Sequence, residues 1–163
     1  MIKFKSKEVQ QKNIEHIANN SFKEAAFFMK ISLFVLIFDL FTYIVAILFN
    51  SFDFGIFFES FSLLFTILAI FSLNKKELHS SKINILLSSA PIFILQLYDL
   101  IVMFINCKGY LFNIIFGYIY LEDILALSLI AILILNLISY LTLKKVGKDL
   151  ATNGNKNWFY EEL

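Results

Sequence analysis

Four long apolar runs dominate the chain, and polar segments of unequal length separate them. The runs cover residues 27–49, 56–73, 83–105 and 121–143. A helix needs about 20 apolar residues to cross the ~30 Å hydrocarbon core of a bilayer, and each run is close to that length. Transmembrane β-strands would be shorter and would alternate in polarity, which these runs do not. The pattern predicts an all-α, polytopic membrane protein with four transmembrane helices.

The segment before the first run has a helical pattern of its own. Residues 7–18 place their apolar side chains near one face, which favours a short amphipathic helix. Asn19-Asn20-Ser21 interrupts that face, and Ser21 with Glu24 forms an S-x-x-E capping box just before the apolar run. We therefore expect a short N-terminal cytoplasmic helix within residues 1–26, separate from an independently capped first span.

The lysines predict how the chain is oriented. All 14 basic residues are lysines. Twelve of them lie at the N-terminus, in the loop 74–82 or after the fourth run, and Lys30 lies one turn inside the first run on the same side, whereas Lys108 lies on the opposite side. Loops rich in positive charge remain in the cytoplasm, so both termini should be cytoplasmic, in a bacterial inner membrane. The expected division is a cytoplasmic segment 1–26, a transmembrane bundle 27–143 and a cytoplasmic tail 144–163.

Composition narrows the function mainly by exclusion. The chain is 59% hydrophobic and 17% charged, with a mean hydropathy of +0.75, which does not fit a soluble domain. Its net charge of +1 gives no general attraction to nucleic acid, so we expect no direct nucleic acid binding. Cys107 is the one cysteine, and His16 and His79 are far apart, so no metal-ligand motif is present. We expect no catalytic residues, no cofactor, no metal and no enzymatic activity.

The most informative residues are polar groups within the apolar runs. These are Asp39, Glu59, Gln96, Asp99 and Asn136. A carboxylate at membrane depth costs about 2.5–3.5 kcal/mol on insertion scales, so the three acids should face the bundle interior. No lysine lies at matching depth to pair with them. Hydrogen-bonded packing, ion passage, protonation sensing and oligomer contacts all remain open as roles for them.

Small and polar residues also recur at helical spacing. In the second run they follow a four-three spacing typical of helix packing in lipid: Gly55, Glu59, Ser62, Thr66 and Ala69. In the fourth run Asn136 adjoins a stripe formed by Ser128, Ser139 and Thr142. Because four short spans with unpaired acids satisfy such groups more easily between subunits than alone, we expect a homo-oligomer.

The C-terminal tail ends on three successive aromatic residues, Trp158, Phe159 and Tyr160. Aromatic side chains in a polar tail can anchor at lipid headgroups. They can equally dock on a protein, because aromatic residues are enriched among binding hot spots. The tail is thus a candidate site for a cytosolic protein partner.

The size, span count and topology of the whole chain resemble the small four-span membrane subunits of bacterial antiphage systems, such as the membrane component of Kiwa. This resemblance assigns no role to any residue, and it implies a membrane-stress sensor paired with a cytosolic effector. We therefore expect a non-enzymatic membrane anchor or sensor that recruits a cytosolic partner. Two alternatives are an oligomeric cation channel, in which Asp39, Glu59 and Asp99 set ion preference, and a membrane immunity protein against a pore-forming toxin.

Overall fold

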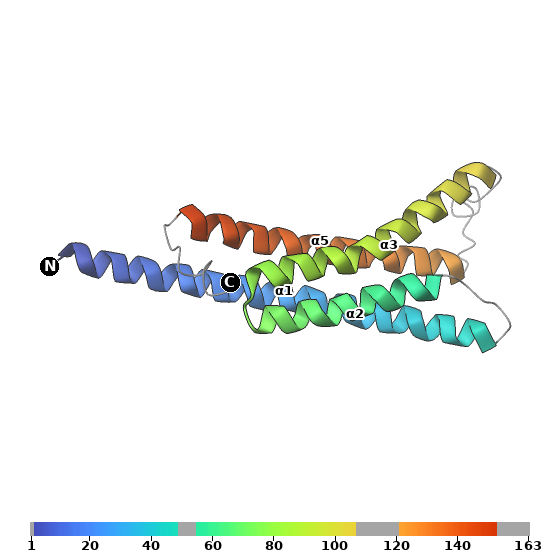
Figure 1. Cartoon of the computed structure of the whole chain (residues 1–163), viewed down its shortest axis with the longest axis horizontal. Helices are drawn as coiled ribbons and strands as arrows, with labels where there is room; N and C mark the ends of the chain where they lie inside the picture. The colour runs from blue at the N-terminus through green and yellow to red at the C-terminus, as the bar shows by residue number, and fades with distance from the viewer. Residues whose placement is uncertain (1, 49–54, 107–120, 153–163) are drawn as a thin grey trace.

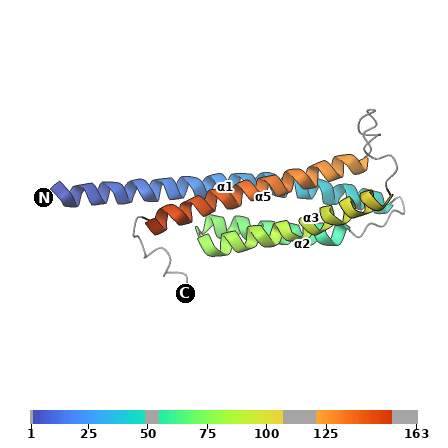
Figure 2. The ribbon, with the colours of Figure 1, turned by 90° about the horizontal axis from the view of Figure 1, so that it is seen from above.

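The structure is a computed structural model that describes residues 2–48, 55–106 and 121–152. Its helices are α1 (Ile2–Leu48), α2 (Gly55–Asn74), α3 (Leu78–Asn106) and α5 (Leu121–Thr152). Successive helices run in opposite directions, as Figures 1 and 2 show. α1 packs on α2 and α5, and α3 packs on the same two helices. The described part of the chain is therefore a four-helix bundle in which each helix has two neighbours.

Helix α1 is one continuous helix, so the predicted break at Asn19-Asn20-Ser21 is wrong. Its 47 residues extend over about 70 Å, roughly twice the thickness of a bilayer core. Ala18 packs against Val146 of α5, and Phe22 lies in a buried apolar cluster with Met29 and Leu73. Contacts therefore hold the helix on both sides of the predicted break. Asn and Ser lower helix propensity by at most about 0.7 kcal/mol each, which these contacts outweigh.

The other helices also extend beyond the predicted runs. α5 continues nine residues past Leu143, so the segment predicted as a tail begins as helix. The predicted loop 74–82 is a tight turn over residues 75–77. The Lys76 amide donates to the Leu73 carbonyl at 3.0 Å and the Glu77 amide to the Ser72 carbonyl at 3.0 Å, which is a Schellman motif. Lys76 occupies its left-handed position, with φ 62°.

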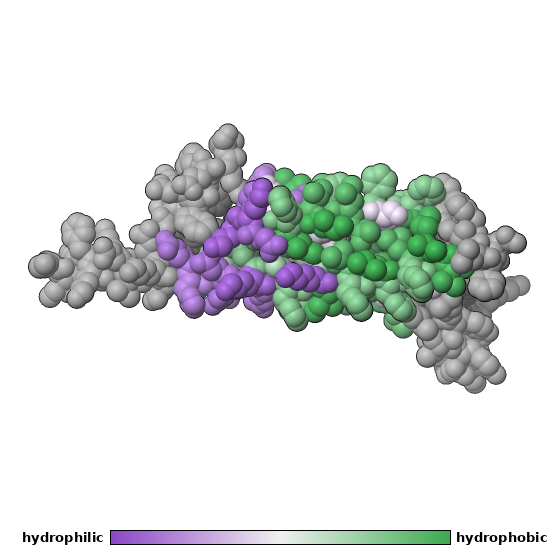
Figure 3. Space-filling model, turned by 90° about the horizontal axis from the view of Figure 1, so that it is seen from below, coloured by the Kyte–Doolittle hydropathy of each residue, from purple (hydrophilic) through white to green (hydrophobic). Residues whose placement is uncertain are grey.

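The outer surface of the bundle is apolar and its interior is partly polar. All four described helices are long and apolar enough to cross a membrane. Large side chains such as Phe34 (73% exposed) and Phe61 (60% exposed) cover the outside, and Figure 3 shows the resulting apolar band beside a hydrophilic end. A soluble bundle has the opposite distribution. The fold thus fits a protein whose sides face lipid, which agrees with the predicted multi-pass membrane protein.

Buried positions follow a four-three spacing along every helix. In α1 the series is Ala18, Phe22, Ala25, Met29, Ser32, Leu36 and Asp39, and Ala26 is buried beside it. This heptad spacing is that of coiled-coil packing, as in other four-helix bundles. It builds two apolar clusters. The first surrounds Met29 and Leu73 near the hydrophilic end, and the second surrounds Leu36 and Ile132 further along.

Candidate functional site

Asn136 lies at the centre of a buried hydrogen-bond network that joins α1, α3 and α5. Its Oδ1 accepts a hydrogen bond from Ser32 Oγ of α1 at 3.0 Å. Its Nδ2 donates to Ser88 Oγ at 3.3 Å and to Ser89 Oγ at 3.1 Å, both on α3. Asn136, Ser32 and Ser88 are fully buried. One amide side chain therefore uses both its acceptor and its donors to connect three helices.

Helix α2 joins the same network through two hydroxyl groups. Ser62 Oγ donates to the carbonyl oxygen of Ser88 at 2.7 Å. Thr66 Oγ1 lies 2.6 Å from Ser88 Oγ, and either group can donate. Both α2 side chains are fully buried. The predicted packing role is confirmed for Ser62 and Thr66, whose partner is α3 of the same chain.

The network occupies a single layer between the two apolar clusters. On α1, Ser32 lies between Met29 of the first cluster and Leu36 of the second. On α3, Ser88 lies between Ile85 and Ile92 in the same way. Surrounding the hydrogen bonds with apolar layers excludes water, and it raises the cost of leaving any one group unsatisfied. This polar layer therefore specifies how the four helices align along the bundle.

Two predicted acids lie beyond the second apolar cluster, away from the hydrophilic end. Asp39 is fully buried, and its Oδ2 accepts a hydrogen bond from Ser128 Oγ of α5 at 2.7 Å. Its Oδ1 is buried without a hydrogen-bond partner among the described residues. Glu59 of α2 is also fully buried. The prediction that these two acids face the interior is confirmed.

The remaining predicted residues are only partly described. Gln96 is half-buried on α3, and its Nε2 has no hydrogen-bond partner in the described part of the chain. The side chain of Asp99, and the tail residues Trp158, Phe159 and Tyr160, lie outside the residues that can be described. Thr142 lies outside the row of buried positions, and its hydroxyl donates to the Ile138 carbonyl of its own helix at 2.9 Å. Leu143 takes the buried position beside it.

The sequence pointed to Asn136 but missed its partners. Ser32 and Asn136 are 104 residues apart, and only the alignment of α1 with α5 brings them together. The signal that could have found them is the shared four-three spacing of buried positions, which places polar residues at one level of every helix. The sequence predicts a homo-oligomer because buried polar groups would need partners from another subunit. Asn136, Glu59 and Asp39 are all enclosed within one chain, so this argument for an oligomer is weaker.

The chemistry of this layer is that of neutral hydroxyl and amide groups. A nucleophile would need a base beside it, but His16 and His79 lie at exposed positions near the hydrophilic end. Within the described residues, no group of three histidine, cysteine or acidic side chains is arranged to hold a metal ion. The layer can fix the positions of the helices relative to one another.

Replacing Thr66 with valine tests the contribution of α2 to this layer. Valine keeps the shape of threonine but removes the hydroxyl that lies 2.6 Å from Ser88 Oγ. Interhelical hydrogen bonds in membrane proteins average about 0.6 kcal/mol and reach about 1.7 kcal/mol. We expect Thr66→Val to lower the free energy of unfolding by about 1 kcal/mol, measured by detergent-induced unfolding in mixed micelles. An unchanged value would mean that the hydroxyl pair adds nothing to stability.

Comparison of the chain with family models, with curated protein sequences and with solved structures finds no match in any of the three.

Proposed function

We propose that this protein is a non-enzymatic membrane anchor and sensor of the bacterial inner membrane that recruits a cytosolic protein. The single observation that carries the proposal is the continuity of α1. One helix contains Ser32 of the buried polar layer and also the polar arm, residues 2–26, at the hydrophilic end. A rigid helix transmits a shift at one end to the other, so the arm reports on the state of the layer.

The polar layer supplies the element that responds. Its hydrogen bonds join four helices at one level, and each bond is worth only about 0.6–1.7 kcal/mol in a membrane protein. A change in bilayer thickness or tension that tilts the helices acts on all of these bonds together. Sensing then consists of a shift between a bonded and a separated layer, and α1 carries that shift to its arm.

The arm offers a surface that the bundle leaves uncovered. Ile17 is 55% exposed, next to Ala18, which is buried against Val146. His16 and Asn20 are exposed on the same stretch. An apolar side chain bordered by polar ones, on a helix held by α5, is suited to bind a partner protein. The resemblance in plan to antiphage membrane subunits supports a cytosolic effector as that partner.

The same geometry favours a sensor over a pore within one chain. Leu36, Ile92, Leu129 and Ile132 are packed together and fully or almost fully buried. They fill the interior between Asp39 and the polar layer. An ion crossing a single bundle would have to pass this apolar layer. Assembly into a homo-oligomer would use the apolar outer faces instead, and it remains part of the proposal.

Site-specific photo-crosslinking in the native cell tests the proposal. A photoreactive phenylalanine analogue replaces Ile17 on the arm, and in a matched control it replaces Phe34, which is 73% exposed within the apolar band. We expect position 17 to form an adduct with one water-soluble protein and position 34 to form no adduct with any water-soluble protein. Failure to obtain such an adduct at position 17, or equal adducts at both positions, would contradict recruitment.

A flux measurement separates the sensor from the channel alternative. Purified protein in liposomes is expected to pass no monovalent cations above the level of empty liposomes. A steady cation flux that Asp39→Asn abolishes would overturn the proposal in favour of a channel.

A further inference from the structure

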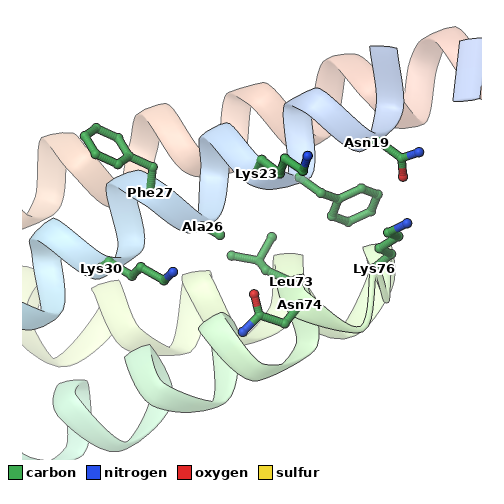
Figure 4. A pocket seen from close by; sticks show the side chains of 9 residues that line it. Asn19, Lys23, Ala26, Phe27, Lys30, Leu73, Asn74 and Lys76 are labelled. Carbon is green, nitrogen blue, oxygen red and sulfur yellow. The ribbon is translucent and has the colours of Figure 1, made fainter. Parts of the chain in front are cut away.

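A cavity of about 530 Å³ lies between α1 and the α2–α3 turn. Figure 4 shows its two sides. Asn19, Lys23, Ala26 and Lys30 of α1 lie on one side, and Leu73, Asn74 and Lys76 lie on the other. Its volume is within the range of about 300–1,000 Å³ for pockets that hold small ligands. Its lining combines three lysines with apolar side chains.

The three lysines, Lys23, Lys30 and Lys76, come from two segments that are distant in the sequence. None of them forms a salt bridge with another described residue, and their acidic chain neighbours, Glu24 and Glu77, do not line the cavity. These three ammonium groups are spread around one cavity whose lining contains no acidic side chain, so the cavity has a positive potential that favours an anion.

Lys75, next to Lys76 in the sequence, does not line the cavity. Lys75 Nζ lies 4.3 Å from the centre of the Phe71 ring, outside the cavity. A cation over an aromatic ring already has a favourable partner. The two successive lysines of the turn therefore have different surroundings. Lys75 contacts the Phe71 ring, whereas Lys76 lines the cavity.

Part of the cavity lining is apolar, and the cavity lies between the hydrophilic end and the apolar band of the bundle. Phe22, Ala26 and Leu73 line it together with the lysines. Its lining contains both lysines and apolar side chains, so it lies at the boundary between the hydrophilic end and the apolar band, the two regions that Figure 3 shows. A freely soluble phosphate would gain nothing from the apolar part, whereas a lipid places its phosphate and its acyl chains on the two sides of this boundary.

We propose that this cavity binds the headgroup of an anionic phospholipid from the leaflet at the lysine-rich end. The positive charges of Lys23, Lys30 and Lys76 around the cavity attract the anionic headgroup, and the acyl chains lie along the exposed apolar surface beside Phe27. The inference rests on the proposed membrane placement, but it requires no cytosolic partner. Because the cavity joins α1 to the α2–α3 turn, a bound lipid links the arm to the composition of the leaflet.

Asn19 points to a particular class of headgroup. It lines the cavity, and its Oδ1 is buried without a hydrogen-bond partner among the described residues. A buried amide oxygen requires a donor, which a phosphate diester cannot supply. A headgroup that carries hydroxyl groups, such as that of phosphatidylglycerol, supplies the phosphate for the lysines. It also supplies a donor for Asn19, provided that the Asn19 side chain turns its enclosed Oδ1 toward the cavity.

Two triple variants of the full-length protein test the site. The cavity variant combines Lys23→Gln, Lys30→Gln and Lys76→Gln. The control variant combines Lys75→Gln, Lys144→Gln and Lys145→Gln, so it removes the same charge from the same end but outside the cavity. Each protein is placed in nanodiscs of phosphatidylcholine with 20% phosphatidylglycerol, and native mass spectrometry measures the fraction released with bound phosphatidylglycerol.

We expect wild-type and control proteins to retain phosphatidylglycerol and the cavity variant to retain at least tenfold less. Glycerol phosphate added to phosphatidylcholine nanodiscs should not bind, since it lacks acyl chains. Equal losses in both variants, or binding of glycerol phosphate as tight as that of the lipid, would overturn the inference. Circular dichroism of each variant in pure phosphatidylcholine nanodiscs checks the fold. A protein that enters no nanodisc contradicts membrane placement, whereas one that enters but retains no lipid contradicts only the lipid site.

Discussion

Replacing Asn136 with alanine is expected to lower the free energy of unfolding by about 2–4 kcal/mol. The change removes three hydrogen bonds, from Ser32 and to Ser88 and Ser89, each worth about 0.6–1.7 kcal/mol in a membrane bundle. It also leaves a cavity in a fully buried layer, where the neighbouring helices can relax only partly. Unfolding in mixed micelles, followed by circular dichroism, measures the loss.

Leu137→Ala provides the matched control for this experiment. Leu137 is the next residue on α5, but it is 56% exposed on the apolar outer surface of the bundle, so truncating it should cost much less. A double-mutant cycle of Asn136→Ala with Ser32→Ala isolates the bond between α1 and α5, and we expect a coupling of about 0.6–1.7 kcal/mol. Equal losses for Asn136→Ala and Leu137→Ala would show that the polar layer does not align the helices.

The features that the sequence predicted well are those encoded within one helix. Apolar runs define spans because the bilayer imposes a minimum length on each helix. The seam of α2 could be recognised because its small and polar residues, from Gly55 to Ala69, repeat on a single face. Burial of Asp39 and Glu59 followed from the cost of exposing a carboxylate to lipid.

The features that the sequence missed depend on contacts between segments. Sequence alone cannot tell whether a polar face meets another helix of its own chain or a second copy of the chain. The Ser32–Asn136 bond required the alignment of two helices whose residues are 104 positions apart. The lysine cavity likewise combines Lys23 and Lys30 with Lys76, which belong to separate charged segments.

The break predicted in α1 failed for an energetic reason. Asn19-Asn20-Ser21 is a weak helix former and can supply a cap, so local preference favours an end there. The packing of Ala18 on Val146 lies outside any local pattern, and it keeps the helix intact. This continuity is the observation on which the proposed function depends most.

Asn20→Pro is therefore expected to disconnect the arm from the bundle. Proline lacks the N–H that bonds to the carbonyl of His16 in a continuous helix, and its ring clashes with that carbonyl, at a cost of about 3 kcal/mol or more. Asn20 is exposed, so the substitution disturbs the helix without opening the core. Spin labels at His16→Cys and Glu24→Cys, with Cys107 replaced by serine, measure the distance across the site. A continuous helix gives a single narrow distance near about 12 Å, and we expect Asn20→Pro to broaden it.

The effect of Asn20→Pro on recruitment decides whether continuity matters for function. Asn20→Ala favours the helix and serves as the control. If α1 transmits the state of the polar layer, Asn20→Pro should remove most of the crosslinked product formed from position 17, while the protein remains in the membrane and Asn20→Ala retains that product. Full crosslinking by a chain with a demonstrably broken α1 would mean that the arm recruits its partner independently of the bundle, and the protein would then be an anchor without a sensing role.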